Sequence, residues 1–213
     1  MGKRRLIGKI VILMLGLAAV VILAANSDTI PVSTPKKGYR VVIDPGHGGS
    51  DCGAVGVSGV KEAGLNLAVS LYLKEELEAL GMEAILTRSD ERALAEGKKA
   101  DMAARGKIMN GEGVDLVVSV HMNKFTDPSV HGPMAFYMKG SAEGEKLAKT
   151  VIDSITDELG APRRIANPGD YYVIRESMPV SVLVECGFLS NSGDEALLQQ
   201  EQHQKKLAHA IAR

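Results

Sequence analysis

Four residues of the sequence have side chains that bind metal ions or move protons, and each stands where a hydrophobic segment begins or ends. They are His47, Glu62, His121 and Glu185. Two histidines with one glutamate are a recurring ligand set for a catalytic zinc ion, which keeps one coordination position open for water. A further group that is not a ligand then has to transfer protons. The four residues together therefore suggest metal-assisted hydrolysis.

Each of these residues also has an ordinary structural explanation. A single histidine at the end of a strand is more often a hydrogen-bonded surface residue than a ligand, and Glu62 alone fits a carboxylate stabilised by a helix dipole. Glu185 is harder to explain in this way, because a carboxylate that closes the apolar run 182–184 is costly to bury unless it is paired or functional. The hypothesis requires the four side chains to meet in space.

Strands and helices alternate along the part of the chain that must position these residues. Hydrophobic patterns and turn residues predict strands over residues 39–44, 83–87, 114–121, 134–138, 172–174 and 181–186. Helices are expected over residues 62–80, 101–110 and 141–159, with Asp101 as a helix N-cap. A capping box at residues 192–195 opens the C-terminal helices.

This alternation predicts an α/β fold, with a single domain built on a mostly parallel, twisted sheet and helices on both faces. In open sheets of this kind, ligands bind beyond the carboxyl ends of the strands. Since the four candidate residues stand near element ends, we expect them at that one edge of the sheet.

The first 38 residues differ from the rest in composition. Four basic side chains within residues 1–9 precede an unbroken apolar run over residues 10–25, which is typical of an export signal. In length the run lies between a long signal-peptide core and a short membrane span, which needs ~20 apolar residues, so residues 1–25 are either a signal peptide or a retained membrane anchor. Residues 26–38 are predicted to be a linker, and residues 39–213 the exported domain.

The composition argues against several classes of protein. Lys and Arg number 25 and Asp and Glu 26, so the chain lacks the basic excess of a nucleic-acid-binding protein. Two cysteines cannot form a four-cysteine zinc site or a disulfide scaffold. Aromatic residues make up 4% and Trp is absent, which argues against an aromatic platform for sugars or bases.

Two other enzyme classes fail on their motifs. A dinucleotide-binding loop needs the pattern G-x-G-x-x-G after a strand, and here Gly46 and Gly48 fit but Asp51 occupies the third glycine position. We expect these glycines to let the backbone turn tightly around His47. A zinc peptidase of the H-E-x-x-H type is also excluded, because that motif is absent from the sequence.

Several blocks resemble, in the same order, the motifs of the zinc-dependent N-acetylmuramoyl-L-alanine amidases of the amidase 3 type. The blocks are residues 41–49 (VVIDPGHGG), 53–56 (GAVG), 62 with 65–68 (E, LNLA), 86–88 (LTR), 119–123 (SVHMN) and 182–191 (VLVECGFLSN). The resemblance runs from about residue 39 to the end of the chain.

The resemblance implies an activity and a role for each candidate residue. His47, Glu62 and His121 correspond to the ligands of one Zn²⁺ ion, and Glu185 corresponds to the catalytic glutamate. The substrate would be peptidoglycan, cleaved at the amide between the lactyl group of N-acetylmuramic acid and L-alanine of the stem peptide. One departure follows Glu62, where many relatives have Lys-Asp and this chain has Ala63-Gly64.

The short exported chain is most similar to the spore-cortex, or germination-specific, amidases. In those enzymes, removal of the stem peptide precedes formation of muramic δ-lactam. The alternatives are a vegetative amidase used in cell separation and a non-catalytic, zinc-containing module that binds the cell wall. The presence of Glu185 argues against the second of these. Peptidoglycan is the expected partner, with a membrane tether if residues 1–25 are retained.

The neighbours of the candidate residues carry further expectations. The two histidines each need a hydrogen-bond acceptor to fix the ring, and Asp44 is a candidate by proximity in sequence. Asn123 either faces the substrate or holds its turn. Cys186 is expected to face away from Glu185 and to pack in the core. Cys52 is not expected to be a ligand, and nothing in the sequence supports a Cys52–Cys186 disulfide.

Overall fold

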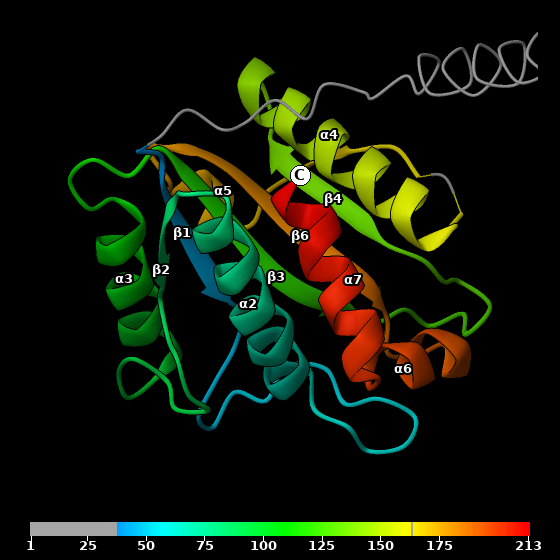
Figure 1. Cartoon of the computed structure of the whole chain (residues 1–213). Helices are drawn as coiled ribbons and strands as arrows, with labels where there is room; N and C mark the ends of the chain where they lie inside the picture. The colour runs from blue at the N-terminus through cyan, green and yellow to red at the C-terminus, as the bar shows by residue number, and fades with distance from the viewer. Residues whose placement is uncertain (1–37, 163) are drawn as a thin grey trace, which may run out of the picture. The chain divides into compact units, whose positions relative to one another are not determined.

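The structure is a computed structural model, and it describes residues 38–162 and 164–213 (Figure 1). The strands are, in chain order, β1 (Arg40–Pro45), β2 (Glu83–Leu86), β3 (Leu116–Asn123), β4 (Met134–Met138), β5 (Asn167–Gly169) and β6 (Val180–Phe188). The helices are α2 (Glu62–Ala79), α3 (Lys98–Met109), α4 (Ala142–Leu159), α5 (Tyr172–Arg175), α6 (Ser192–Leu198) and α7 (Glu201–Ala212). The expected export segment and all but the last residue of the expected linker lie outside these residues. Within the described part, no helix is long and apolar enough to cross a membrane.

The six strands form one sheet in the order β2-β1-β3-β6-β4-β5. Strands β2, β1, β3 and β6 are parallel neighbours, whereas β4 runs antiparallel to β6 and pairs in parallel with β5. The carboxyl ends of β1, β3 and β6 therefore lie side by side. This arrangement confirms the predicted α/β fold with a mostly parallel sheet.

Helices cover both faces of this sheet, because successive side chains of a buried strand point to opposite sides. On β1, Val41 and Ile43 pack in the core formed with α2, α4 and α7, whereas Val42 packs in the opposite core with α3 and α5. Figure 1 shows α2, α7 and α4 side by side on the first face. On β6, Cys186 packs in that first core, so Glu185 faces the other side, as expected.

One short element differs from its prediction. Residues 172–174 were expected to form a strand, but they belong to helix α5, and the strand in this region is β5 instead. Val173 and Ile174 are buried against the opposite core. A run of only three residues shows no periodicity, so propensity alone cannot distinguish a strand from a single helical turn.

The starts of two helices also differ from their predictions, because the expected capping side chains bond other groups. Helix α3 begins at Lys98, and the Asp101 carboxylate accepts from the backbone N–H of Leu94 and from the side chain of Arg105. Helix α6 is capped by Asn191, which accepts from two backbone N–H groups. The buried Glu195 carboxylate, expected to close a capping box, instead accepts from the N–H and hydroxyl of Ser58.

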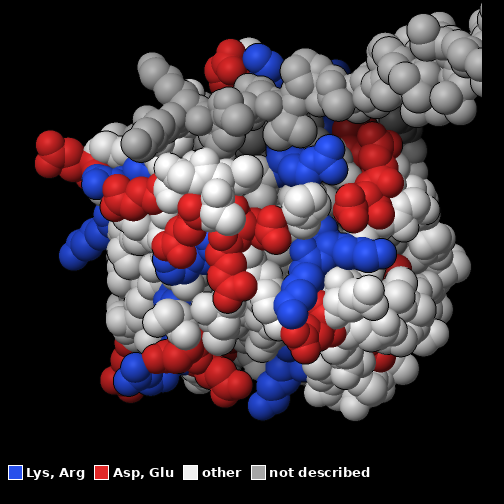
Figure 2. Space-filling model, viewed as in Figure 1, with Lys and Arg blue, Asp and Glu red and all other residues white. Residues whose placement is uncertain are grey.

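The outer side of α2, α4 and α7 carries mixed charge. Figure 2 shows acidic and basic side chains beside one another on this face. Lys74 pairs with Glu78 on α2, and Lys205 pairs with Glu201 on α7. Exposed pairs of this kind add little to stability, so they indicate a solvated helix surface more than a structural clamp.

Candidate active site

A cavity of about 450 Å³ lies at the carboxyl ends of the central strands. The strand register places His121 on β3 beside Glu185 on β6, and Pro45 on β1 beside Val120. Glu62 enters from the first turn of α2, and the segment between β5 and α5 forms another side of the cavity. The structure therefore brings all four candidate residues to one edge of the sheet, as the sequence predicted.

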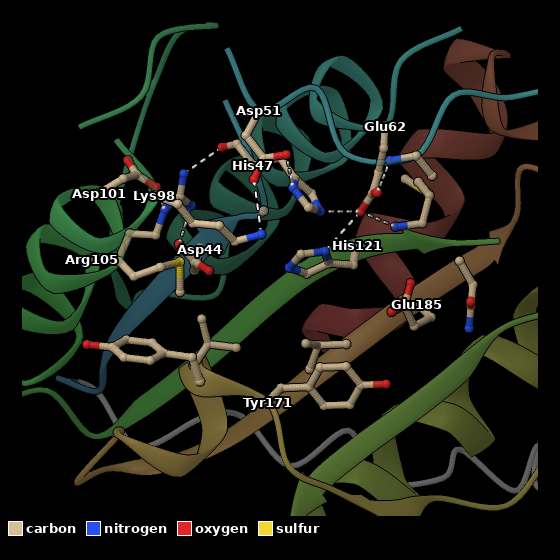
Figure 3. Close-up of a pocket in the computed structure, with 18 of the residues that line it drawn as sticks. Asp44, His47, Asp51, Glu62, Lys98, Asp101, Arg105, His121, Tyr171 and Glu185 are labelled. Carbon is tan, nitrogen blue, oxygen red and sulfur yellow. Dashed lines mark hydrogen bonds and ion pairs between the residues drawn. The ribbon is translucent and has the colours of Figure 1, made fainter. Parts of the chain in front are cut away.

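Three of these side chains converge on one point (Figure 3). The Glu62 Oε1 atom lies 2.9 Å from His121 Nδ1 and 3.3 Å from His47 Nε2. One ligand atom from each residue lies within 4.8 Å of the others. The two imidazole rings stand edge to face with centroids 5.0 Å apart. Two nitrogen donors and one carboxylate oxygen at this spacing are suited to holding a divalent metal ion.

Glycine residues allow this close approach. A Cβ atom on Gly46 would lie 2.1 Å from His121 Cε1, and one on Gly53 would lie 2.4 Å from Glu62 Oε2. His47 itself has a φ of 62°, in the left-handed region that a non-glycine residue rarely adopts. Gly46 and Gly53 thus allow three side chains to pack against one another. The tight turn expected from the sequence is confirmed by Gly48 and Gly49, whose φ values are 137° and 60°, and by the backbone hydrogen bonds between Gly48 and Asp51.

Asp51 orients His47, and sequence reasoning missed this role. The Asp51 Oδ1 atom lies 3.0 Å from His47 Nδ1, which leaves Nε2 to face Glu62 and His121. The sequence suggested Asp44 for such a role, but no hydrogen bond or ion pair joins Asp44 to the ring of His47 or of His121; its bonds go to Thr87, Ser119 and Arg105. The sequence signal that could have indicated Asp51 is its position four residues after His47 in a glycine-rich loop, where the chain can fold back on itself.

Asp44 supports the site from beneath. It is fully buried and accepts hydrogen bonds from Thr87, Ser119 and Arg105. Burial alone would raise the pKa of the Asp44 carboxyl, but the Arg105 guanidinium and these hydrogen bonds hold it below its usual value. The ion pair is therefore charged, and the buried Arg105 is neutralised by two carboxylates, that of Asp44 and that of Asp101 on its own helix.

Two arginines fix the loop that carries His47. Arg105 donates to the carbonyl oxygens of Pro45 and His47, and Arg88 donates to those of Pro45 and Gly46. Arg88 belongs to one of the blocks that carry the family resemblance, where it had no assigned role. The loop with the left-handed His47 backbone is thus held by one side chain from α3 and one from the segment that follows β2.

The Glu62 carboxylate is surrounded by donors. Its Oε2 accepts from the N–H of Ala54 at 2.8 Å, and its Oε1 accepts from Asn66 Nδ2 at 3.1 Å and the N–H of Met122 at 3.2 Å. Burial by itself raises the pKa of Glu62, but hydrogen bonds and charge interactions with His121 and His47 lower that pKa far below its usual range. Glu62 is therefore an anion with a fixed orientation, as a ligand requires.

Glu185 has a contrasting environment. It is 8% exposed, and its Oε2 atom is buried without a hydrogen-bond partner among the described residues. Burial raises the pKa of Glu185 to about 7, although the nearby His121 opposes this shift. A carboxyl group with a pKa near neutrality can both accept and release a proton under ordinary conditions.

The remaining polar candidates have structural positions. Asn123 Oδ1 accepts from the N–H of Lys124 at 2.8 Å, so this side chain holds its own turn while it lines the cavity. Cys52 and Cys186 are free thiols. Burial raises the pKa of the Cys186 thiol well above its usual value, in agreement with a residue that packs in the core.

Comparisons with known proteins agree with this site. The family described as N-acetylmuramoyl-L-alanine amidase matches residues 41–213. The germination-specific N-acetylmuramoyl-L-alanine amidase of Bacillus subtilis (strain 168) is 32% identical over 87% of this chain and 82% of its own length. Among solved structures, the CwlD amidase from Clostridioides difficile, in complex with the GerS lipoprotein, matches with a TM-score of 0.78 and 31% identity. That match covers 82% of this chain and 94% of the CwlD chain.

A second solved structure gives the same answer. The catalytic domain of CwlV, an N-acetylmuramoyl-L-alanine amidase from Bacillus (Paenibacillus) polymyxa var. colistinus, matches with a TM-score of 0.74 and 32% identity. The match covers 82% of this chain and 94% of that domain. Both structures share the fold of this chain, and both are named amidases, as the family is. The chain therefore belongs to the N-acetylmuramoyl-L-alanine amidase family and is an enzyme of this type.

Proposed function

We propose that the chain cleaves the amide between N-acetylmuramic acid and L-alanine with a zinc ion held by His47, Glu62 and His121. The donor set fits this ion, because two imidazole nitrogens and one charged carboxylate leave a coordination position open. When bound, zinc polarises an amide carbonyl and lowers the pKa of a water molecule. Asp51 keeps the His47 ring turned so that Nε2 faces the metal position.

We assign proton transfer to Glu185. Its carboxylate takes one proton from the attacking water as the new C–O bond forms, and it passes that proton to the stem-peptide nitrogen as the C–N bond breaks. The products are the free lactyl carboxylate and a peptide with a free L-alanine amino group. Among the described residues no donor holds the Oε2 atom, so this carboxylate is not committed to another protein group.

The observation that carries the proposal is the contrast between the three converging side chains and the unpaired Glu185 beside them (Figure 3). The test is release of L-alanine amino groups from purified peptidoglycan by the protein as prepared, after chelation, and after addition of zinc. We expect chelation to abolish release and zinc to restore it. An apoprotein that keeps its full rate would contradict the metal assignment.

For the biological role, we propose removal of stem peptides in the spore cortex, before muramic δ-lactam forms. The support is the similarity to the germination-specific relative. The test is expression of this chain in a spore-forming host that lacks its germination-specific amidase, with the cortex analysed by mass spectrometry. Restored δ-lactam supports the proposal. Unchanged cortex together with corrected separation of vegetative cells would favour the cell-separation role.

We also propose that residues 1–25 direct export, as a signal peptide or as an anchor, and that residues 26–38 link them to a catalytic domain over residues 39–213. The support is the basic stretch followed by an apolar run. A chain that begins at Asn26 is expected to fold and to keep its amidase activity, since its core is built from later residues. Aggregation of this shortened chain would show that the apolar run belongs to the fold.

A further inference from the structure

The cavity contains a hydroxyl group to which the proposed mechanism gives no role. We propose that the Tyr171 hydroxyl donates a hydrogen bond to the carbonyl oxygen of the scissile amide as negative charge develops on that oxygen. This inference rests on the proposed function of the cavity. It adds a catalytic residue from the segment between β5 and α5, on the side of the cavity across from His47 and Glu62 (Figure 3).

The position of the Tyr171 ring is set by packing. It meets Phe136 of β4 edge to face, with centroids 5.1 Å apart and an interplanar angle of 61°. A Cβ atom on Gly169 would lie 2.7 Å from the Tyr171 ring, so only glycine leaves room for the ring at that position. The backbone of Tyr171 forms the N-cap of α5, which fixes the start of the side chain. Because both the backbone and the ring face of Tyr171 are fixed, the side chain can present its hydroxyl with little loss of conformational entropy.

The hydroxyl faces the reacting groups. Figure 3 shows the Tyr171 side chain directed toward the part of the cavity where Glu185 lies. Within the described part of the chain, no hydrogen-bond acceptor contacts this hydroxyl, and the residue is 38% exposed. Burial and the charge of Glu185 raise the pKa of Tyr171, so the phenol keeps its proton and remains a donor at neutral pH.

The three basic side chains that line the cavity besides the histidines already have partners. The Arg105 guanidinium bonds Asp44 and backbone carbonyls, and Lys124 Nζ donates to the carbonyl oxygen of Val55 at 2.8 Å. Lys98 Nζ lies 3.6 Å from a carboxylate oxygen of Asp51. The neighbouring tyrosine at position 172 turns its hydroxyl toward Gly106 of α3. Tyr171 is thus the tyrosine of this pair that faces the reaction.

The hydrogen bond changes the energy of the step without changing its balance. The water oxygen adds to the carbonyl carbon, the C–N bond breaks, and the proton passes from water through Glu185 to the leaving nitrogen. Tyr171 keeps its own proton throughout. Removing one donor from a developing oxyanion costs about 10²–10³-fold in kcat, because the donor is aimed at charge that is greatest in the transition state.

The test compares Tyr171→Phe and Tyr171→Ala with wild type, with Tyr72→Phe on α2 as the matched control. Tyr72 lies over Lys205 in the contact between α2 and α7, away from the cavity. We expect Tyr171→Phe to lower kcat by about 10²-fold or more while KM, zinc content and the circular dichroism spectrum stay unchanged. Tyr171→Ala should be at least as slow, and Tyr72→Phe should keep the wild-type rate.

Two results would overturn the assignment. If Tyr171→Phe keeps the wild-type kcat while Tyr171→Ala is slow, the ring only packs. If Tyr171→Phe changes zinc content in parallel with its rate, the residue supports the metal site instead. Measuring Glu185→Gln in the same assay separates the two proposals. A wild-type rate for Glu185→Gln refutes the proposed proton transfer, whereas a wild-type kcat for Tyr171→Phe refutes only the role of Tyr171.

Discussion

The two walls of the cavity differ in how completely their polar groups are paired. The paired wall, formed by His47, Glu62 and His121, has hydrogen bonds to nearly every functional atom, and Asp51 extends it. The unpaired wall, formed by Glu185 and Tyr171, leaves a buried carboxylate oxygen and a phenolic hydroxyl without partners among the described residues. The comparison teaches that one wall is built to hold an ion in place. The other keeps free the groups that substrate and water must meet, at a cost in stability.

The largest effect should come from replacing the glutamate of each wall by the neutral glutamine. Glu185→Gln should keep zinc and fold but lose about 10²–10⁴-fold in rate, since the amide cannot accept the proton of water. Glu62→Gln should lose zinc first, because a neutral amide is a poor ligand. Zinc content and rate measured together on both variants distinguish the walls. Loss of zinc from Glu185→Gln would refute the separation of roles.

The support beneath the paired wall gives the next largest effect. Arg105→Met leaves the Asp44 carboxylate buried without its ion partner, and breaking a buried pair in this way costs about 3–5 kcal/mol. Urea unfolding of the metal-free protein measures the change in the free energy of unfolding. Arg92→Met is the matched control, since Arg92 pairs with Asp90 at the surface. A loss no larger than that of the control would show that the pair is not needed for folding.

A smaller effect should follow from Asp51. Asp51→Asn weakens the acceptor that fixes the His47 ring, and the expected loss is about 10–100-fold in zinc affinity. Competition with a metal-binding dye measures this affinity. Asp153→Asn on the exposed side of α4 serves as the control. Unchanged affinity in Asp51→Asn would mean that packing against Glu62 and His121 is sufficient to orient the ring.

The last effect is a difference in pH dependence between the unpaired wall and Asp44, which lies beneath the paired wall. Burial raises the pKa of Glu185 to about 7, so the folded protein binds this proton more tightly than the unfolded chain, with its pKa of about 4.3. The free energy of unfolding of the metal-free protein should therefore fall as pH rises from about 4 to about 7. Asp44 acts in the opposite sense, because its lowered pKa gives stability that is lost as pH falls below about 4.

Glu185→Gln tests this difference directly. It should remove the contribution of Glu185 to the decline in the free energy of unfolding between pH 4 and 7, and it should raise Tm at pH 8, because the neutral amide carries no cost of burying a charge. Differential scanning calorimetry of the metal-free proteins measures it. If both proteins show the same slope, Glu185 does not titrate near neutrality in the folded chain.

The hydrophobic pattern of the sequence was sufficient to predict the bounds of some strands and helices. It failed to predict helix caps whose side chains bond groups elsewhere in the chain. The bounds of β4 were predicted to the residue, and helix α4 begins one residue after its prediction, with Ser141 as the N-cap. Asp101 and Glu195 are of residue types that cap helices. In the structure, however, the Asp101 carboxylate accepts from Leu94 and Arg105, and the Glu195 carboxylate accepts from Ser58. A cap competes with tertiary partners that sequence spacing does not reveal.

The sequence by itself determined the alternation of strands and helices, the family, and the four candidate residues, because residue type and hydrophobic period are local properties. Only the tertiary structure decided which groups surround those residues. It selected Asp51 over Asp44 as the partner of His47, placed Arg105 beneath the loop, and turned Tyr171 into the cavity. These contacts join segments from different strands and loops, and their geometry follows from strand order and packing, which no single stretch of sequence contains.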